Sequence, residues 1–422
     1  MSSRMSLKAA QAGPDTGQLQ VDVTSASNQY PIPDARVSIA RTEEPEQVLE
    51  ELETNGSGQT EEVTLRTPPL EYSMEPEQAA RPYAEYTLTI QAEGFEPAVV
   101  AGSEVLPGVI SIQPVRLKPL EPSNAPVDIF IPDHTLYGEY PPKIAEAEIK
   151  PTQETGEIVL SRVVVPETVV VHDGVPTDAS APDYFVPYRD YIKNVASSEI
   201  YATWPYATIV ANILAIMSFT LNRVYTEWYR NKGYDFTITT STAFDMKWIY
   251  GRNIFQPISE VVDEIFDQYL SRPEVKQPIL TQFCDGQRVT CPNWMSQWGS
   301  KYLGDQGYSP IEILRNYYGS SIYINSAEQI SGIPSSWPGY DLTIGSSGNK
   351  VRQLQEQLQT IAGVYTAIPS LMVTGYYDED TANAVREFQS IFGLGQTGIT
   401  DFPTWYKISQ IYVGVTRIAE LQ

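Results

Sequence analysis

The sequence of 422 residues has few of the side chains that most often bind metals, since it contains two cysteines and two histidines. Cys284 and Cys291 are seven positions apart, and His134 and His172 lie more than a hundred residues before them. A structural zinc site usually takes four Cys or His ligands, so we expect neither a metal nor another cofactor. The two cysteines suit either a disulfide that closes a short loop or two free thiols, and the sequence leaves both open.

Basic residues are also scarce, because 28 Lys and Arg face 52 Asp and Glu, for a formal net charge of −24. Such a chain repels phosphate backbones and anionic lipid, which argues against nucleic acid as a partner and against a charged membrane surface. The imbalance is strongest in the first third, where residues 1–160 carry 26 of the acids and 10 of the bases.

Long apolar runs are missing as well. Residues 1–20 lack the apolar core of a secretory signal peptide, so we expect no Sec signal. The most apolar stretch, residues 207–225, is interrupted by Asn212, Ser218 and Asn222, and it falls short of the roughly 20 clean apolar residues of a membrane span. We predict a buried core helix there and no membrane span.

The patterns that are present predict a multidomain α+β protein. Residues 17–118 alternate apolar and polar side chains as half-buried strands do, residues 166–330 mix helical and strand patterns, and residues 345–422 predict three short helices. Residues 1–16 show no pattern and are expected to form a disordered tail. Residues 119–165 are rich in proline and acids, which is typical of a linker.

The N-terminal strands resemble the β-sandwich of carboxypeptidase-regulatory or prealbumin-like modules. The matching positions are Gly17, Leu19, Val21 and Val23, followed by Pro31, Ile32, Ala35 and Val37. Such modules usually bind or cover a partner and carry no chemistry. The acidic residues 41–62 within this region are expected to form an exposed loop or a short helix.

The C-terminal helices resemble the type-1 peptidoglycan-binding module, a three-helix fold. The matching positions are Val351, Leu354, Gln355, Leu358, Gly375, Tyr377, Thr381, Ala384, Val385, Phe388, Gln389, Gly393, Leu394, Gly398, Thr404 and Trp405. Thr374 and Thr397 stand where the family has aspartates. The resemblance implies that this module binds peptidoglycan, with Tyr377, Phe388 and Trp405 as its candidate binding residues.

The central region contains the segment "NVASSEIYATWP" and, later, "MSQWGSKYLGDQGYSPIEILRNYYGSS". Both resemble stage II sporulation protein D and its relatives, in which the first segment carries the catalytic glutamate. The resemblance implies that Glu199 is catalytic and that Arg223 and Tyr225 form the family's Arg-x-Tyr motif. The candidate substrate-binding residues are Tyr201, Trp204, Arg223, Tyr225, Asp285, Ser296, Gln297 and Trp298.

Two features of this match bear on the chemistry. Cys291 stands where the wider family has a histidine, so any role of that histidine is missing here. Tyr201, Trp204 and Trp298 are expected to form an apolar wall that raises the pKa of Glu199. For Arg223, a structural salt bridge is the alternative to a role in substrate binding.

The order of sandwich, linker, sporulation-D-like domain and peptidoglycan-binding module resembles the clostridial spore cortex-lytic enzyme precursors of the SleC type. This resemblance implies the proprotein of a lytic transglycosylase that cleaves the β-1,4 bond between N-acetylmuramic acid and N-acetylglucosamine in the spore cortex or cell wall. It also implies that a subtilisin-like protease cuts within residues 119–165 and removes residues 1–160 as a prodomain. The alternative is a non-catalytic peptidoglycan-binding structural protein of the spore or cell wall.

Overall fold

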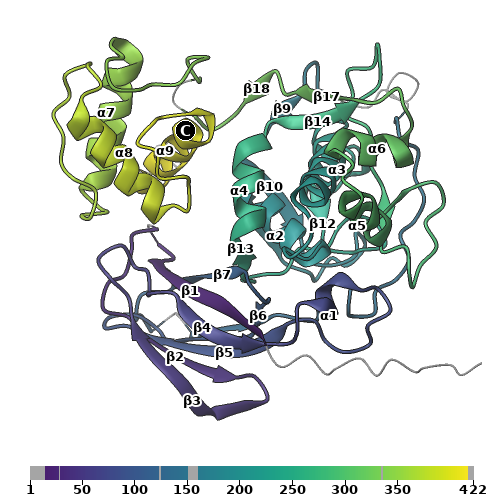
Figure 1. The fold of residues 1–422 in the computed structure, drawn as a ribbon, viewed down its shortest axis with the longest axis horizontal. Coiled ribbons are helices and arrows are strands. Elements are labelled where there is room, and N and C mark those ends of the chain that lie inside the picture. Colours follow the sequence, from purple (N-terminus) through teal and green to yellow (C-terminus); the bar gives the residue numbers. More distant parts are fainter. Residues whose placement is uncertain (1–14, 28, 123–124, 151–159, 334–335, 417–422) are drawn as a thin grey trace, which may run out of the picture.

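The computed structural model describes residues 15–27, 29–122, 125–150, 160–333 and 336–416. They form an N-terminal β-sandwich, a central α+β domain and a C-terminal group of helices (Figure 1). The tail predicted for residues 1–16 lies outside the described part, except that the first strand already begins at Asp15.

The sandwich is built from two sheets that share one apolar core. Its elements are β1 (Asp15–Ser25), β2 (Arg36–Arg41), β3 (Glu44–Glu53), β4 (Val63–Thr67), α1 (Glu71–Met74), β5 (Ala84–Gln91), β6 (Ala98–Val105), β7 (Ile110–Leu117) and β8 (Val127–Phe130). One sheet has the order β3-β2-β5-β6-β8, and the other contains β7-β1-β4. Leu19, Val21 and Val23 of β1 are fully buried while their neighbours are not, which is the alternation that the sequence predicted.

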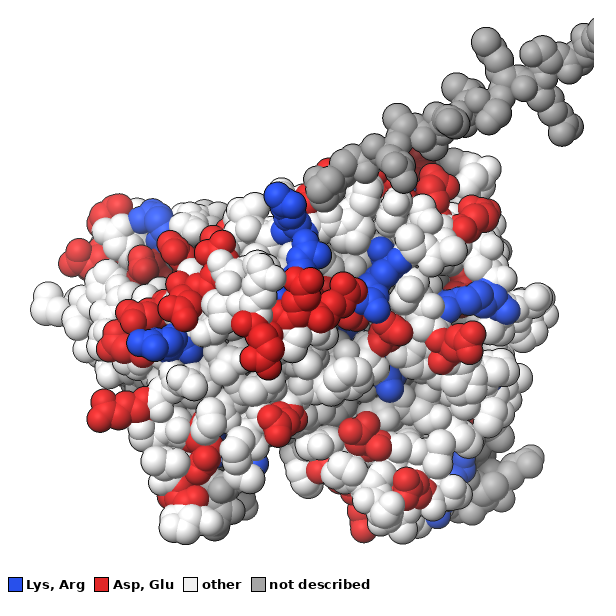
Figure 2. Space-filling model, turned by 90° about the horizontal axis from the view of Figure 1, so that it is seen from below, with Lys and Arg blue, Asp and Glu red and all other residues white. Residues whose placement is uncertain are grey.

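The acidic segment after β2 is a strand, so the expectation of a loop or short helix was wrong. β3 pairs antiparallel with β2 at the edge of its sheet, and nearly all of its side chains are exposed. Acidic residues spread over this side of the molecule (Figure 2). Charged side chains on an edge strand discourage pairing with the edge strand of another chain.

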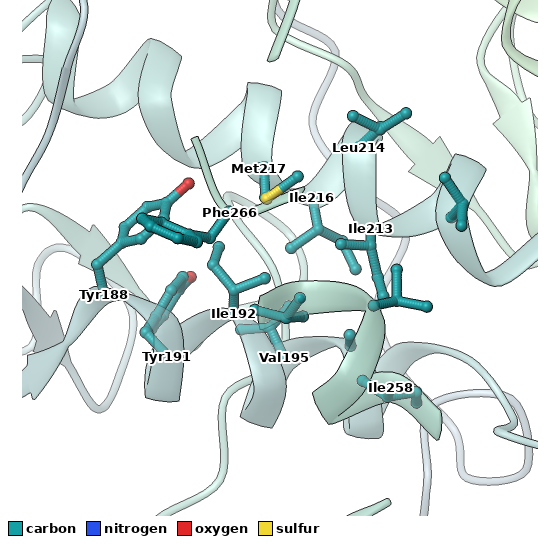
Figure 3. Close-up of a cluster of buried hydrophobic side chains, with 14 of the residues drawn as sticks. Tyr188, Tyr191, Ile192, Val195, Ile213, Leu214, Ile216, Met217, Ile258 and Phe266 are labelled. Atoms are coloured by element: carbon teal, nitrogen blue, oxygen red, sulfur yellow. The ribbon is translucent and has the colours of Figure 1, made fainter. Parts of the chain in front are cut away.

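The central domain packs short strands and loops around a core of helices. Its elements are β9 (Val164–Val165), β10 (Thr168–His172), β11 (Asp183–Pro187), α2 (Tyr188–Glu199), α3 (Tyr206–Tyr225), η1 (Arg230–Lys232), β12 (Ile238–Thr239), β13 (Ile254–Phe255), α4 (Gln256–Ile265), β14 (Gln268–Ser271), β15 (Phe283–Cys284), β16 (Met295–Ser296), α5 (Gln297–Asp305), α6 (Pro310–Tyr318), β17 (Tyr323–Ser326) and β18 (Gln329–Ile330). Apolar side chains of α2 and α3 meet Ile258 of α4 and Phe266 in the core (Figure 3).

Helix α3 occupies the middle of this core. It is long and apolar enough to cross a membrane, yet 89% of its most apolar window is buried inside the protein. Asn212 donates a hydrogen bond to Ser300 of α5, and Asn222 donates to the backbone of Pro278, so both side-chain amide N–H groups have partners within the fold. These contacts agree with the predicted core helix.

The C-terminal module consists of α7 (Asn349–Ala362), α8 (Glu379–Ile391) and α9 (Phe402–Thr416). Gln355 of α7 accepts hydrogen bonds from the N–H groups of Thr374 and Gly375, and Gln389 of α8 accepts one from Gly398. Each buried glutamine therefore holds the turn that follows its own helix. Asp378 caps the N-terminus of α8 by accepting the N–H of Thr381.

The sandwich and the central domain share a sheet. Strand β13 pairs antiparallel with β7, which extends the sandwich by one strand from the central domain. Beside this junction the buried side chains of Arg252 and Glu104 form an ion pair at 2.9 Å. A sandwich on a loose tether, as the linker prediction implied, is therefore not what the structure shows.

Where it is described, the predicted linker contains a short strand and contacts the central domain. Strand β8 adds to the sandwich parallel to β6, and residues 131–150 then continue along the central domain. Glu146 and Glu148 of this segment pair with Arg223 and Arg272 of the central domain. Residues 151–159, within the predicted cleavage region, lie outside the described part of the chain.

Candidate functional site

Glu199 is the last residue of α2, and its side chain is buried, with 5% of the residue exposed. Ile200 is extended, so the helix ends at the acid and the chain turns away. The C-terminal end of a helix carries partial negative charge, which disfavours an ionised carboxylate there. The position of Glu199 in its helix thus already favours the protonated acid.

The partners of the Glu199 carboxylate are neutral groups. Its Oε1 accepts the backbone N–H of Lys247 at 2.8 Å, and Gln297 Nε2 lies 3.3 Å from its Oε2. Thr135 Oγ1 lies 3.4 Å from the same oxygen. Among the described residues, no Lys, Arg or His side chain lies within ion-pairing distance of it.

Burial dominates the proton affinity of this acid. Loss of hydration raises the pKa of Glu199, and the charge of Lys143 and the three hydrogen-bond donors only partly oppose that rise. The same burial lowers the pKa of Lys143. Glu199 therefore stays protonated to higher pH than an exposed glutamate, as a general acid requires.

Glu199 opens onto a pocket of about 400 Å³. The pocket is lined by Thr135, Gly138, Glu139, Tyr140, Pro141, Pro142, Lys143, Glu199, Thr242, Phe283, Cys284, Asp285, Arg288, Val289 and Gln297. Nearly half of this lining comes from residues 135–143, which precede the central domain in the chain. We call residues 133–143 the covering segment.

The covering segment is held in place from both sides. Thr135 donates its hydroxyl to the backbone carbonyl of Ser198 at 2.6 Å, immediately beside Glu199. From the opposite wall the Arg288 guanidinium donates to the carbonyls of Thr135 and Tyr137 at 2.8 Å each, and also to that of Gly138. These contacts hold the segment along one wall of the pocket.

The opposite wall is a loop closed by a disulfide between Cys284 and Cys291. Asp285 organises this loop, because its carboxylate accepts the N–H groups of Gln287, Arg288 and Val289 and pairs with the Arg288 guanidinium. Asp285, a predicted substrate-binding residue, thus lies at the pocket, but its oxygens are already used within the loop.

Helix α5 supplies the third side of the site. Ser296 caps this helix by accepting the N–H of Gly299, and Gln297 follows in its first turn. Gln297 Nε2 donates to the backbone carbonyl of Glu199 at 2.7 Å as well as approaching the carboxylate. Of the predicted residues, Glu199, Asp285 and Gln297 therefore line one pocket, with Ser296 directly behind them.

The predicted aromatic wall lies elsewhere. Tyr201, Trp204 and Trp298 form a buried cluster with ring centroids 5.0 to 6.1 Å apart, and none of them lines the pocket. Trp204 donates its indole N–H to the carbonyl of Ser73 in α1, so it contacts the sandwich side. Tyr201 and Trp204 belong to the turn after Glu199, and Trp298 packs against them. The apolar surface beside the acid comes from Tyr140, Pro141, Pro142 and Phe283.

The assignment of Arg223 and Tyr225 to substrate binding is corrected by their burial. Arg223 has a fully buried side chain that pairs with Asp245 at 2.7 Å and Glu146 at 2.6 Å. Tyr225 is 9% exposed at the far end of α3, and its carbonyl accepts the N–H of Leu160. The salt bridge, which was the structural alternative for Arg223, is the arrangement present.

In the C-terminal module, Tyr377, Phe388 and Trp405 are at most 1% exposed and therefore hold the helices together. They are core residues and do not offer a surface to a polymer. Tyr376, which directly precedes Tyr377 and was not identified from the motif, is 51% exposed.

Several residues at the pocket were missed by the sequence analysis. Thr135, Tyr140 and Lys143 belong to the predicted linker, where no motif drew attention to them. Lys247 contacts Glu199 through its backbone, and a backbone contact leaves no signal in side-chain identity. Arg288 lies between the two cysteines, and its place in a short closed loop was the one available signal.

No group of three or more His, Cys, Asp or Glu side chains suited to a metal ion occurs among the described residues. His134 is fully buried and contacts the carbonyl of Ile200, and His172 pairs with Asp183. Cys284 and Cys291 are used in their disulfide. These four side chains do not converge on one site.

Comparisons with known proteins identify one part of the chain. Residues 347–408 match the family model of a putative peptidoglycan binding domain. The zinc D-Ala-D-Ala carboxypeptidase of Streptomyces albus G is 40% identical over 75 residues, which is 18% of this chain and 28% of that protein. The chain thus aligns with less than a third of the length of this relative.

Solved structures resemble the chain only locally. The match to the Bacillus anthracis TIE protein covers 25% of this chain and 17% of that protein at 12% identity, with a TM-score of 0.18. The match to Klebsiella pneumoniae 5-hydroxyisourate hydrolase covers 25% of this chain and 92% of that protein at 18% identity, with a TM-score of 0.16. These scores carry no argument about function. What the comparisons establish is that the chain contains a type-1 peptidoglycan-binding domain, which suggests an association with the cell wall.

Proposed function

We propose that the protein is the precursor of a peptidoglycan lytic transglycosylase in which Glu199 is the acid and base. The observation that carries this proposal is a buried glutamate with neutral partners and a raised pKa, in a pocket on the same chain as a peptidoglycan-binding domain. A carboxyl group that is protonated near neutral pH can donate a proton to a leaving oxygen.

The chemistry needs one carboxyl group. Glu199 gives its proton to the glycosidic oxygen as the bond to C1 of N-acetylmuramic acid breaks. The resulting carboxylate then takes the proton from O6 of the same sugar, and O6 bonds to C1 to form a 1,6-anhydro ring. The proton returns to Glu199, and no water is consumed.

A hydrolase would need a second carboxylate at the correct distance. Asp285 and Glu139 are the other acids at the pocket. Asp285 already accepts several hydrogen bonds from its own loop, and Glu139 lies on the covering segment, which has to leave before a polymer can enter. The transglycosylase reaction therefore fits this site better than hydrolysis does.

The position of the covering segment at the Glu199 pocket supports the proposal of a precursor. The covering segment, and not the sandwich, lines the pocket and contacts Glu199, so inhibition would come from residues 133–143. We propose that a subtilisin-like protease cuts within residues 119–165, in the spore cortex or cell wall, and that the covering segment then departs. The ion pairs of Glu146 and Glu148 have to break in that step.

A second candidate function comes from the Streptomyces relative, a zinc carboxypeptidase. The donors in this chain do not fit a zinc site, because both cysteines are oxidised and both histidines are committed to separate contacts. The remaining alternative is a peptidoglycan-binding structural protein without activity. Product analysis with purified peptidoglycan distinguishes all three, since the transglycosylase makes 1,6-anhydro ends, a carboxypeptidase shortens the stem peptides, and a structural protein leaves the polymer unchanged.

The test of the catalytic residue is Glu199→Gln in a fragment that begins near Val163. We expect this variant to lose about 10²-fold or more of its glycan-cleaving rate while keeping its fold and its binding to sacculi. Retention of more than a tenth of the normal rate would exclude Glu199 as the general acid.

The C-terminal module has its own test. Full-length protein and a variant lacking residues 345–422 are mixed with purified sacculi and sedimented. We expect the truncated protein to remain in the supernatant, and equal sedimentation of the two would show that another part of the chain binds the wall.

A further inference from the structure

A cluster of aromatic side chains lies one residue beyond the Glu199 contact. The Lys247 N–H bonds to Glu199, and the next residues along the chain place Trp248 and Tyr250 beside Tyr184 of β11. The Tyr184 and Tyr250 rings are stacked with centroids 4.8 Å apart and an interplanar angle of 27°. The Trp248 ring lies 5.3 Å from Tyr184 and 6.3 Å from Tyr250. We call these three residues the aromatic platform.

The platform is fixed in position relative to the pocket. Ile249, between Trp248 and Tyr250, donates its N–H to the side chain of Asn194 at 3.0 Å and accepts from it at 2.8 Å. Asn194 lies on α2, the helix that ends at Glu199. Helix α2 therefore positions both Glu199 and the backbone between Trp248 and Tyr250.

The platform is open to solvent on one side. Tyr250 is 43% exposed, and Tyr184 is half-buried. Trp248 is 5% exposed, and its indole N–H is buried without a hydrogen-bond partner. A buried donor without a partner is costly, and stacked rings left in water gain nothing from their outer faces. A ligand that presents C–H groups can cover the exposed ring faces, whereas the indole N–H lies inside the protein and is not part of this contact.

Lys247 links the platform to the pocket. Its ammonium lies 5.6 Å from the Tyr140 ring centroid at the pocket wall, and among the described residues it forms no ion pair. A cation at this point suits a ligand that also carries a carboxylate, as a muramic residue does. Pyranose rings present C–H groups to an aromatic face, whose negative quadrupole attracts them.

We propose that Tyr184 and Tyr250, with Trp248 beside them, form a sugar-stacking subsite that holds the glycan strand as it leaves the Glu199 pocket. This inference rests on the proposed function, because it assigns the strand that Glu199 cleaves to this surface. It commits to the carbohydrate backbone and not to the stem peptide, since two stacked rings offer a face on which a pyranose ring can lie.

The test measures binding of a hexamer of β-1,4-linked N-acetylglucosamine to the full chain by calorimetry. Tyr184→Ala with Tyr250→Ala removes the stacked faces, whereas Tyr184→Phe with Tyr250→Phe keeps the rings and loses only the hydroxyls. Tyr302→Ala, which removes a tyrosine 65% exposed on α5, is the control for loss of any exposed ring. Near-ultraviolet circular dichroism checks that each variant is folded.

We expect the double alanine variant to bind the hexamer about tenfold more weakly, while the phenylalanine pair and the Tyr302 variant stay within about twofold of the parent. In the trimmed fragment the alanine pair should raise KM for peptide-free glycan more than it lowers kcat. Equal affinity of the alanine pair and the parent would overturn the subsite.

The outcome is separable from that of the catalytic proposal. If Glu199→Gln cleaves glycan normally while the alanine pair loses affinity for the hexamer, Glu199 is not the acid but the subsite stands. If Glu199→Gln is inactive and the alanine pair binds and cleaves as the parent does, the acid stands and the subsite is wrong. If the alanine pair loses affinity only for peptide-bearing fragments, the surface binds the stem peptide and the carbohydrate assignment fails.

Discussion

Two buried carboxylates in the central domain behave in opposite ways. Asp263 of α4 has a side chain 1% exposed and pairs with Arg189 at 3.1 Å, Lys193 at 2.6 Å and Lys407 at 3.6 Å. Glu199 is buried to a similar degree, but its partners are two N–H groups and a hydroxyl. Burial alone would raise both pKa values, yet the three cations hold the pKa of Asp263 well below its usual range, whereas the pKa of Glu199 stays raised.

The contrast shows what distinguishes a structural acid from a reactive one in this fold. Asp263 joins α2 and α4 to Lys407 of the peptidoglycan-binding domain, so its charge holds the two domains together. Glu199 is left without a counter-charge at the end of a helix, so its proton is available. The identity of the neighbours, and not the depth of burial, separates the two roles.

Removing the charge of Asp263 should have the largest effect on stability. Asp263→Asn leaves three buried cations without their carboxylate, and we expect a loss of about 3–5 kcal/mol in the free energy of unfolding. Burial lowers the pKa of Lys407 to about 7 with Asp263 present, so this lysine should lose its proton more readily in the variant. Urea unfolding measures the change.

Glu260→Gln, on the exposed face of the same helix, is the matched control and should be nearly neutral. If Asp263→Asn and Glu260→Gln unfold at the same urea concentration, the interpretation of Asp263 as the charge that holds the interface is wrong.

The same type of change at Glu199 should do the reverse. Glu199→Gln is expected to remove about 10²-fold or more of the activity and to leave stability unchanged or higher, because it replaces a poorly solvated acid by a neutral amide. The folded pKa of Glu199 is raised above its unfolded pKa, so the parent loses stability as pH rises from the unfolded pKa through the folded pKa. The gain in stability of the variant should therefore grow over that window and level off above it. Thermal unfolding at two pH values, compared with the parent, measures it; a fall in stability of several kcal/mol would contradict the contrast with Asp263.

Loosening the covering segment should have an intermediate effect. Arg288→Ala removes the donors to the carbonyls of Thr135, Tyr137 and Gly138, so the full-length protein should expose Glu199 more often and cleave glycan up to about tenfold faster. The fragment that begins near Val163 lacks the segment, and there the substitution should not raise the rate. An increase in both proteins would mean that Arg288 acts on the reaction and not on the cover.

The smallest predicted effect concerns the pH profile. Gln297 donates to the ionised form of Glu199, so Gln297→Leu should raise the pKa of Glu199 further. Glu199 is active as an acid below its pKa, and the alkaline limb of kcat/KM should therefore move to higher pH in the variant. A shift to lower pH would show that another group controls that limb.

Much of the fold follows from local patterns in the sequence. The alternation in β1, the apolar spacing in α3 and the helix pattern of the C-terminal module all appear as predicted, because each depends on short-range periodicity. The edge strand β3 was missed since its acids face solvent on both sides, and a strand without a buried face has no alternation to detect.

The candidate site was only partly predictable. Glu199, Asp285 and Gln297 were identified from sequence segments, and they line one pocket. Arg223 was misassigned because its partners, Asp245 and Glu146, are distant in sequence and their pairing is set by tertiary structure. The covering segment was missed for a similar reason, since proline-rich chain without periodicity gives no sign of what it packs against.

Mass spectrometry of the reaction products shows directly whether Glu199 catalyses transglycosylation. The trimmed fragment and its Glu199→Gln variant are incubated with purified cortex or vegetative glycan, and the new ends are identified. If Glu199 is the acid and base, the parent produces 1,6-anhydromuramic ends and the variant produces none. Reducing muramic ends from the parent would show hydrolysis, and cleaved stem peptides with intact glycan would show a peptidase; either result would contradict Glu199 as the acid and base of a lytic transglycosylase.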